Sequence, residues 1–148
     1  MKNITFDQNG YYLDGKPIFL SSAELPYFRV PRKDWRFRLE KLKETGANCV
    51  CTYIPWAIYE PTDGKFVLEA GGPYDINAFL KLCAEMDLPV ICRPGPYCYS
   101  ELRYDGLPVW LCKNHPEIVA KDFHGEIFSA TSVSYTHPYY LKRVKQWF

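Results

Sequence analysis

Long apolar runs are absent from this sequence, and so is any excess of charge. No stretch approaches the roughly 18 apolar residues of a membrane span, and the N-terminal MKNITFDQNG lacks the apolar segment of a signal peptide. The 18 basic and 17 acidic residues leave a net charge of +1, so neither a basic surface for nucleic acid nor an acidic tail is present. We therefore expect a cytoplasmic chain with uncharged partners, not nucleic acid or a membrane.

Cysteine motifs are also absent, although the chain contains six cysteines. None of them forms a CxxC pair, and none has a histidine partner at the spacing of a zinc site. Most lie in apolar segments, which is typical of reduced thiols in a protein core; disulfides or a metal site are the alternatives. We expect reduced thiols, no metal and no cofactor.

Aromatic residues, in contrast, are abundant. They make up 17% of the chain and include 12 tyrosines and 4 tryptophans. Flat apolar rings with polar tips suit a carbohydrate-binding cleft, and they suit an ordinary aromatic core equally well. Composition alone leaves both interpretations open.

Strand and helix signals alternate along the chain after a short β-rich lead-in. The expected strands are residues 4–7, 11–13, 18–22, 48–53 and 88–93, and the expected helices are residues 32–45, a helix capped by Asp75 and a helix beginning at Pro138. The last three of these strands are continuously apolar and are joined by helices, which is typical of parallel βαβ units with right-handed crossovers. The predicted fold class is α/β.

The length limits which α/β architecture is possible. A chain of 148 residues suffices for one domain with its own core, whereas a complete (β/α)₈ TIM barrel needs about 250 residues. We expect residues 1–148 to form the N-terminal portion of such a barrel, with about three strands plus the β lead-in, ending before the fourth strand. The remainder of the barrel would then be required for a complete site.

Each loop that follows a predicted central strand carries a glutamate among aromatic residues and prolines. These residues are Glu24, Glu60 and Glu101, the last within RPGPYCYSELRYDGLPVWL. The C-terminal ends of parallel barrel strands form the active-site face, so the three carboxylates should converge there. A solvated loop carboxylate is the alternative interpretation of each.

Three blocks carry a family resemblance: AELPYFRVPRKDW, LKETGANCVCTYIPWAIYEPTDGKF and RPGPYCYSELRYDGLPVWL. In this order they resemble the N-terminal part of glycoside hydrolase family 35, the family of retaining β-galactosidases. The resemblance runs from about residue 9 to residue 148. It implies a (β/α)₈ catalytic barrel and the release of terminal β-linked galactose from an oligosaccharide or glycoconjugate.

The resemblance also implies roles for individual residues. Tyr53 in CTYIPW matches a tyrosine that hydrogen-bonds galactose, and Ser100 with Glu101 matches an Ala-Glu pair that binds the same sugar. Glu101 would then be a buried acceptor of sugar hydroxyl groups and not the proton donor. Glu60 and Arg93 would mainly support these residues, whereas Glu24 could either touch the ligand or brace Arg29 and the barrel rim.

The sequence departs from the family pattern at several positions beside the expected site. Pro26 stands where a histidine is usual, residues 56–59 read Trp-Ala-Ile-Tyr where Trp-Asn-x-His is common, and residues 98–102 read Cys-Tyr-Ser-Glu-Leu in place of a Cys-Ala-Glu-Trp type of run. These changes leave the sugar specificity of the expected site open. A β-glucosaminide is the alternative substrate.

A retaining glycosidase needs an acid/base and a nucleophile about 5–5.5 Å apart. In the family, the acid/base follows an asparagine at the end of the fourth strand and the nucleophile comes later, so both are expected beyond Phe148. No Asn-Glu dipeptide occurs in these residues. We expect the 148 residues alone to be inactive; a non-catalytic sugar-binding remnant and a fragment that complements another polypeptide are the alternatives.

Overall fold

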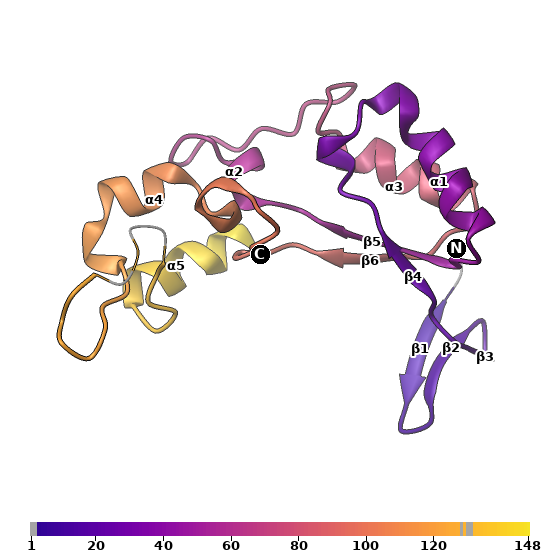
Figure 1. The fold of residues 1–148 in the computed structure, drawn as a ribbon, viewed down its shortest axis with the longest axis horizontal. Coiled ribbons are helices and arrows are strands. Elements are labelled where there is room, and N and C mark those ends of the chain that lie inside the picture. Colours follow the sequence, from indigo (N-terminus) through magenta and orange to yellow (C-terminus); the bar gives the residue numbers. More distant parts are fainter. Residues whose placement is uncertain (1–2, 128, 130–131) are drawn as a thin grey trace. The chain divides into compact units, whose positions relative to one another are not determined.

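A computed structural model describes residues 3–127, 129 and 132–148. The chain divides into two compact units, the first comprising Met1–Thr52 and Ile76–Ile91 and the second Tyr53–Asp75 and Cys92–Phe148. Figure 1 shows the elements of both. Two strands run from the first unit into the second, so the loops at their C-terminal ends belong to the second unit.

The chain begins with an antiparallel three-stranded sheet in the first unit. Its strands are β1 (Ile4–Asp7), β2 (Gly10–Leu13) and β3 (Lys16–Ile18), in the order β1-β2-β3. Gln8 and Asn9 make the first turn, where the Asp7 carboxylate accepts a hydrogen bond from the Asn9 N–H at 2.7 Å. The predicted β lead-in is therefore present.

A second three-stranded sheet has the order β4-β5-β6, and its strands are β4 (Ser22–Glu24), β5 (Cys49–Tyr53) and β6 (Val90–Arg93). β4 and β5 pair in parallel. Between β5 and β6, the hydrogen bonds Val50 N to Pro89 O and Ile54 N to Arg93 O, both 2.9 Å, advance in the same direction along both strands. Helix α1 (Trp35–Glu44) connects β4 to β5 and α3 (Ile76–Glu85) connects β5 to β6, so the fold class is α/β as predicted.

The predicted central strand at residues 18–22 is wrong. Residues up to Ile18 belong to β3, and the strand that joins the central sheet is Ser22–Glu24. Between them the side chain of Asn48 accepts from the Ser21 N–H at 2.9 Å and donates to the Phe19 carbonyl at 2.8 Å. At residues 19 and 21, hydrogen bonds to the Asn48 side chain stand in place of the backbone hydrogen bonds of a strand. The Phe19 residue is 85% exposed.

The core of the first unit is aromatic. Helix α1 begins at Trp35, one turn later than predicted, because residues 32–34 form a 3-10 turn after Pro31. Trp35 packs edge-on against Tyr27 and Phe79, and Tyr27 stacks on Phe79 at 5.1 Å between ring centroids. The Trp35 indole N–H donates to the carbonyls of Tyr27 and Val30, so this buried polar group is satisfied.

The described residues of the second unit form three α-helices around a separate core. They are α2 (Trp56–Tyr59), α4 (Val109–Asn114) and α5 (Pro138–Trp147), accompanied by the 3-10 helices Arg103–Gly106 and Pro116–Ile118; another 3-10 helix, Tyr27–Arg29, lies in the first unit. The core includes Trp56, Leu107, Trp110 and Tyr140. α5 begins at Pro138 as predicted, whereas α2 and α4 were not predicted because six or fewer residues give little helical periodicity.

The six cysteines, all within the described residues, are not joined in disulfides; Cys49, Cys83, Cys98 and Cys112 are buried, and Cys92 is exposed. Among the described residues, no helix is both long and apolar enough to cross a membrane.

Candidate functional site

Five of the six predicted site residues belong to the second unit, and they are Tyr53, Glu60, Arg93, Ser100 and Glu101. Glu24 is the exposed last residue of β4 and belongs to the first unit. That Glu24, Glu60 and Glu101 converge stays a prediction.

Tyr53 and Arg93 are the last residues of two neighbouring strands and contact each other directly. The Arg93 guanidinium donates to the Tyr53 hydroxyl oxygen at 2.8 Å, and its central carbon lies 3.7 Å from the centroid of the Tyr53 ring. The Ile54 N–H donates to the Arg93 carbonyl at 2.9 Å. A hydrogen bond, a cation–π contact and a backbone bond together fix the orientation of this phenol.

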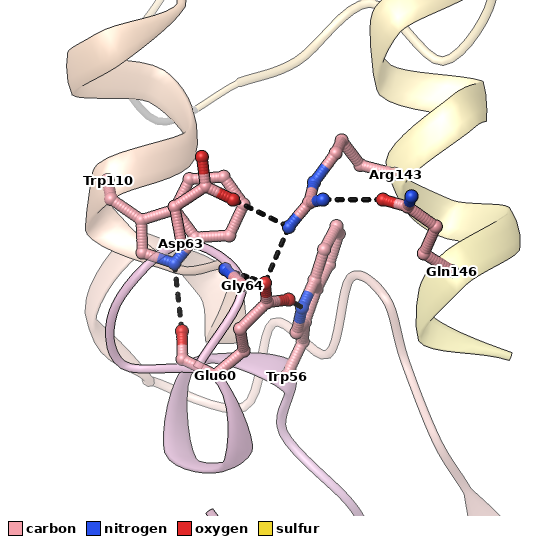
Figure 2. Close-up of polar contacts among 7 residues, drawn as sticks. All are labelled: Trp56, Glu60, Asp63, Gly64, Trp110, Arg143 and Gln146. Atoms are coloured by element: carbon pink, nitrogen blue, oxygen red, sulfur yellow. Dashed lines mark hydrogen bonds and ion pairs between the residues drawn. The ribbon is translucent and has the colours of Figure 1, made fainter. Parts of the chain in front are cut away.

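Glu60 occupies a fully buried position in the loop after β5 (Figure 2). One carboxylate oxygen accepts from the Trp56 indole N–H at 2.5 Å, and the other accepts from the Gly64 N–H at 2.8 Å and from the Arg143 guanidinium at 2.5 Å. Three donors therefore hold a carboxylate that has no exposed surface. Glu60 acts as an anchor inside the protein and is not positioned to contact a ligand.

Arg143 extends this anchor to helix α5 (Figure 2). Its side chain is only 12% exposed and also pairs with Asp63 at 2.8 Å. The guanidinium lies 4.9 Å from the centroid of the Trp110 ring, and the Trp110 indole N–H donates to the Glu60 carbonyl at 2.8 Å. α5, α4 and the loop after β5 thus meet at one ion-paired cluster.

The loop after β6 has an unusual backbone at the predicted sugar-binding residues. Tyr99, Ser100 and Glu101 have φ angles of 59°, 52° and 49°, in the left-handed region. This region costs an L-residue about 1–2 kcal/mol, so three in succession require support. The N–H groups of Cys98 and Tyr99 supply some by donating to the Asp105 carbonyl at 2.8 and 3.2 Å. Residues strained in this way are concentrated at ligand-binding and catalytic sites.

Glu101 itself is exposed, so the expectation of a buried carboxylate at this position is wrong for the chain as it stands. Glu101 is the last of the three left-handed residues, and the run begins directly after the buried Cys98. Ser100 is partly buried.

Two exposed tyrosines flank this part of the loop. Tyr97 and Tyr99 are 36% and 64% exposed, and their ring centroids lie 6.2 Å apart. Partial burial, followed by the nearby Asp105 carboxylate, raises the pKa of Tyr97 above its usual value. Like any tyrosine hydroxyl group at neutral pH, that of Tyr97 is protonated and can donate as well as accept a hydrogen bond.

Sequence reasoning missed the residues of α5 that reach these loops. Tyr140, Arg143, Val144 and Trp147 face the interior, while Leu141 is 45% exposed. Their spacing of three, four and seven residues is that of one helix face. The spacing was therefore present in the sequence, but no role was predicted for Arg143 or Trp147.

A family model for glycosyl hydrolases family 35 matches residues 11–148. The chain belongs to glycoside hydrolase family 35. The predicted resemblance is thereby confirmed.

Relatives within family 35 and a solved structure are similar over most of the chain. An exo-β-D-glucosaminidase from Thermococcus kodakarensis is 38% identical over 153 aligned positions, covering 100% of this chain and 20% of the relative. A β-galactosidase from Felis catus is 44% identical over 108 positions, covering 73% of this chain and 16% of the relative. The crystal structure of a β-galactosidase from the psychrophilic Marinomonas ef1 shares the fold with a TM-score of 0.68 at 19% identity, over 84% of this chain and 18% of that one. The chain thus spans about a fifth of the length of the family 35 relatives that it matches.

Proposed function

We propose that residues 1–148 supply the first part of the (β/α)₈ catalytic barrel of a glycosidase that releases terminal β-linked galactose with retention of configuration. Three observations support this proposal: membership of family 35, the parallel β4-β5-β6 sheet with helical crossovers, and the fold shared with a solved β-galactosidase. In this proposal the three strands are the first barrel strands, and β1 to β3 precede them as a lead-in.

The contact between Tyr53 and Arg93 is the observation that carries the proposed sugar site. It fixes a tyrosine hydroxyl group at the C-terminal ends of two neighbouring parallel strands, which is where barrel enzymes bind their substrates. A hydroxyl group held this way can hydrogen-bond a sugar oxygen without first losing side-chain freedom, because Arg93 has already oriented it.

Glu101 and Ser100 complete the proposed site from the loop after β6. An ionised carboxylate can accept hydrogen bonds from two sugar hydroxyl groups, and such charge-assisted bonds are roughly twice as strong as neutral ones. The Glu101 side chain is exposed in these residues, so in this proposal substrate and the remainder of the barrel would enclose it. Glu60 and Arg93 support the site, as does Glu24 at the end of β4.

Chemistry at the anomeric carbon is assigned to other parts of the protein. None of the residues described has a place as acid/base or nucleophile in this proposal, because Glu60 is buried in its cluster and Glu101 binds sugar hydroxyl groups. These 148 residues by themselves are therefore expected to bind the terminal sugar weakly and not to hydrolyse glycosides.

A β-glucosaminide is the second candidate substrate. The exo-β-D-glucosaminidase from Thermococcus kodakarensis aligns with the whole of this chain, whereas the β-galactosidase from Felis catus aligns with 73% of it. The changed positions at Pro26 and at residues 98–102 adjoin the proposed site in sequence.

The test compares hydrolysis of p-nitrophenyl β-galactoside and β-glucosaminide by the full-length protein, with the first-formed anomer followed by NMR. Glu101→Gln should lower kcat/KM on the preferred substrate by about 30- to 160-fold, because losing a charged hydrogen-bond acceptor costs about 2–3 kcal/mol. Glu40→Gln, at an exposed glutamate of α1, is the matched control and should be neutral. An unchanged rate for Glu101→Gln would remove that residue from the site, and saturable sugar binding without hydrolysis would indicate a non-catalytic binding protein.

A further inference from the structure

Trp147, near the end of α5, packs against the loop that follows β5. Its ring stacks on Trp56 with centroids 5.9 Å apart and planes 19° apart, and it stacks on Phe66 at 6.5 Å and 12°. Tyr59 adds a third contact at 6.4 Å and 30°. The indole is therefore held in place by three aromatic rings of one loop.

The same indole also bonds the loop that follows β6. Its N–H donates to the Pro94 carbonyl at 2.6 Å. Pro94 directly follows Arg93, whose guanidinium donates to the Tyr53 hydroxyl oxygen and whose carbonyl accepts from the Ile54 N–H. The indole of Trp147 thus contacts both loops. The carbonyl that it bonds belongs to Pro94, the residue directly after the arginine that bonds Tyr53.

We propose that Trp147 is a positioning residue for terminal-sugar recognition, acting on Tyr53 through the Pro94 carbonyl and Arg93. This inference rests on the proposed function, because it assigns Tyr53 to the sugar. Arg143 lies on the same helix but bonds Glu60 and Asp63 of the loop after β5 and Gln146 of α5. Of these two α5 side chains, within the part of the chain that the structure describes, it is Trp147 that has a hydrogen bond to the loop after β6.

The physical reason lies in what the Pro94 carbonyl would lose. A partly buried carbonyl needs a hydrogen-bond donor, and the indole N–H supplies one from a ring that cannot move away from its aromatic neighbours. Without it the Pro94–Gly95 peptide, one residue beyond Arg93, is freer to rotate. The guanidinium and the phenol that it orients would move with it, and a misplacement of about 1 Å is enough to weaken an active-site contact severely.

The experiment is a double-mutant cycle in the full-length protein. Trp147→Phe keeps an aromatic ring but removes the donor, Tyr53→Phe removes the hydroxyl group, and the two are then combined. Replacement of Trp147 by benzothienylalanine, which has sulfur in place of the indole N–H, is the second variant, because it preserves the shape of the ring if Trp147→Phe fails to fold. Trp35→Phe is the matched control: it removes a buried indole donor that bonds two carbonyls in the first unit.

Trp147→Phe should raise KM for the preferred glycoside about 3- to 10-fold with kcat changed less than twofold, which corresponds to one lost hydrogen bond. In the Tyr53→Phe background the same change should raise KM less than twofold further, because Tyr53 no longer transmits it. Trp35→Phe should leave KM unchanged. An equal fold-change in both backgrounds would overturn the proposal and would make Trp147 a purely structural residue.

A readout independent of hydrolysis separates this inference from the proposed function. With 3-fluorotyrosine at position 53, the ¹⁹F resonance should shift in both Trp147 variants and stay in place in Trp35→Phe. A resonance that does not move in either Trp147 variant overturns the positioning role. If the resonance moves while Tyr53→Phe leaves glycoside turnover unaltered, Trp147 does position Tyr53 and the assignment of Tyr53 to the sugar is what fails.

Discussion

Removing the positive charge that faces Glu60 should release α5 from the loop after β5. The change is Arg143→Met, which keeps an unbranched side chain of similar reach but deletes the guanidinium. Glu60 would remain fully buried with two neutral donors, the Trp56 indole N–H and the Gly64 N–H, and with no countercharge.

The magnitude follows from how deeply the pair is buried. Breaking a buried ion pair on one side costs about 3–5 kcal/mol, because an uncompensated charge is left inside the protein. Arg143 also pairs with Asp63, whose side chain is 43% exposed. Losing this second ion pair therefore adds less than about 1 kcal/mol. The opening equilibrium of α5 should therefore rise by about 150- to 5,000-fold.

Native-state hydrogen exchange of the full-length protein, read by mass spectrometry over residues 138–147, measures that opening directly. Arg36→Met is the matched control: Arg36 pairs with Glu85 at 3.0 Å, but the side chains are 55% and 63% exposed. Exchange over α1 should accelerate less than about fivefold in that variant, because exposed pairs contribute up to about 1 kcal/mol.

Adding Glu60→Gln to Arg143→Met should slow α5 exchange again, since no unpaired charge then remains in the interior. The reasoning is refuted if Arg143→Met accelerates exchange over α5 no more than Arg36→Met does over α1. If the double variant exchanges faster than the single variant, the shape of the arginine side chain matters and its charge does not.

Two further outcomes are expected from the loop after β6. Burial raises the pKa of the Cys98 thiol to about 11, so the stability that the protonated thiol contributes is complete below pH 9 and is lost as the pH rises through 11. In urea titrations, Cys98→Ala should therefore lose less stability than wild type over this pH interval. Parallel curves for the two proteins would contradict the raised pKa of this thiol. Gly106→Ala should lower Tm more than Gly64→Ala, because both have positive φ but only at Gly106 would the new Cβ lie 3.0 Å from the Cys98 Cβ; equal Tm shifts would show that crowding is not the cause.

The long periodic elements could be predicted from the sequence, whereas the junctions between them could not. α1, α3, β5 and β6 were predicted to within a few residues, because each carries apolar side chains at a spacing typical of a helix or a buried strand in its sequence. The strand at 18–22 was misplaced because the Asn48 side chain, distant in sequence, bonds residues 19 and 21. Such a contact leaves no local pattern.

The candidate site divides in the same way. Tyr53 and Arg93 could be placed because they end apolar strands. The left-handed backbone at Glu101 could not, because it has positive φ angles at three residues that are neither glycine nor asparagine. The buried Glu60–Arg143 pair joins residues 83 positions apart, and no feature near either residue indicates its partner.

That separation of 83 positions also has a consequence for biosynthesis. At a synthesis rate of about 5–20 residues per second, the ribosome adds Glu60 to the chain roughly 4–17 s before it adds Arg143. During this interval the carboxylate must stay hydrated, because closing Trp56 over it would bury a charge without its partner. The loop after β5 therefore remains open on the nascent chain until α5 emerges, and translation order makes it one of the last parts of these residues to assemble.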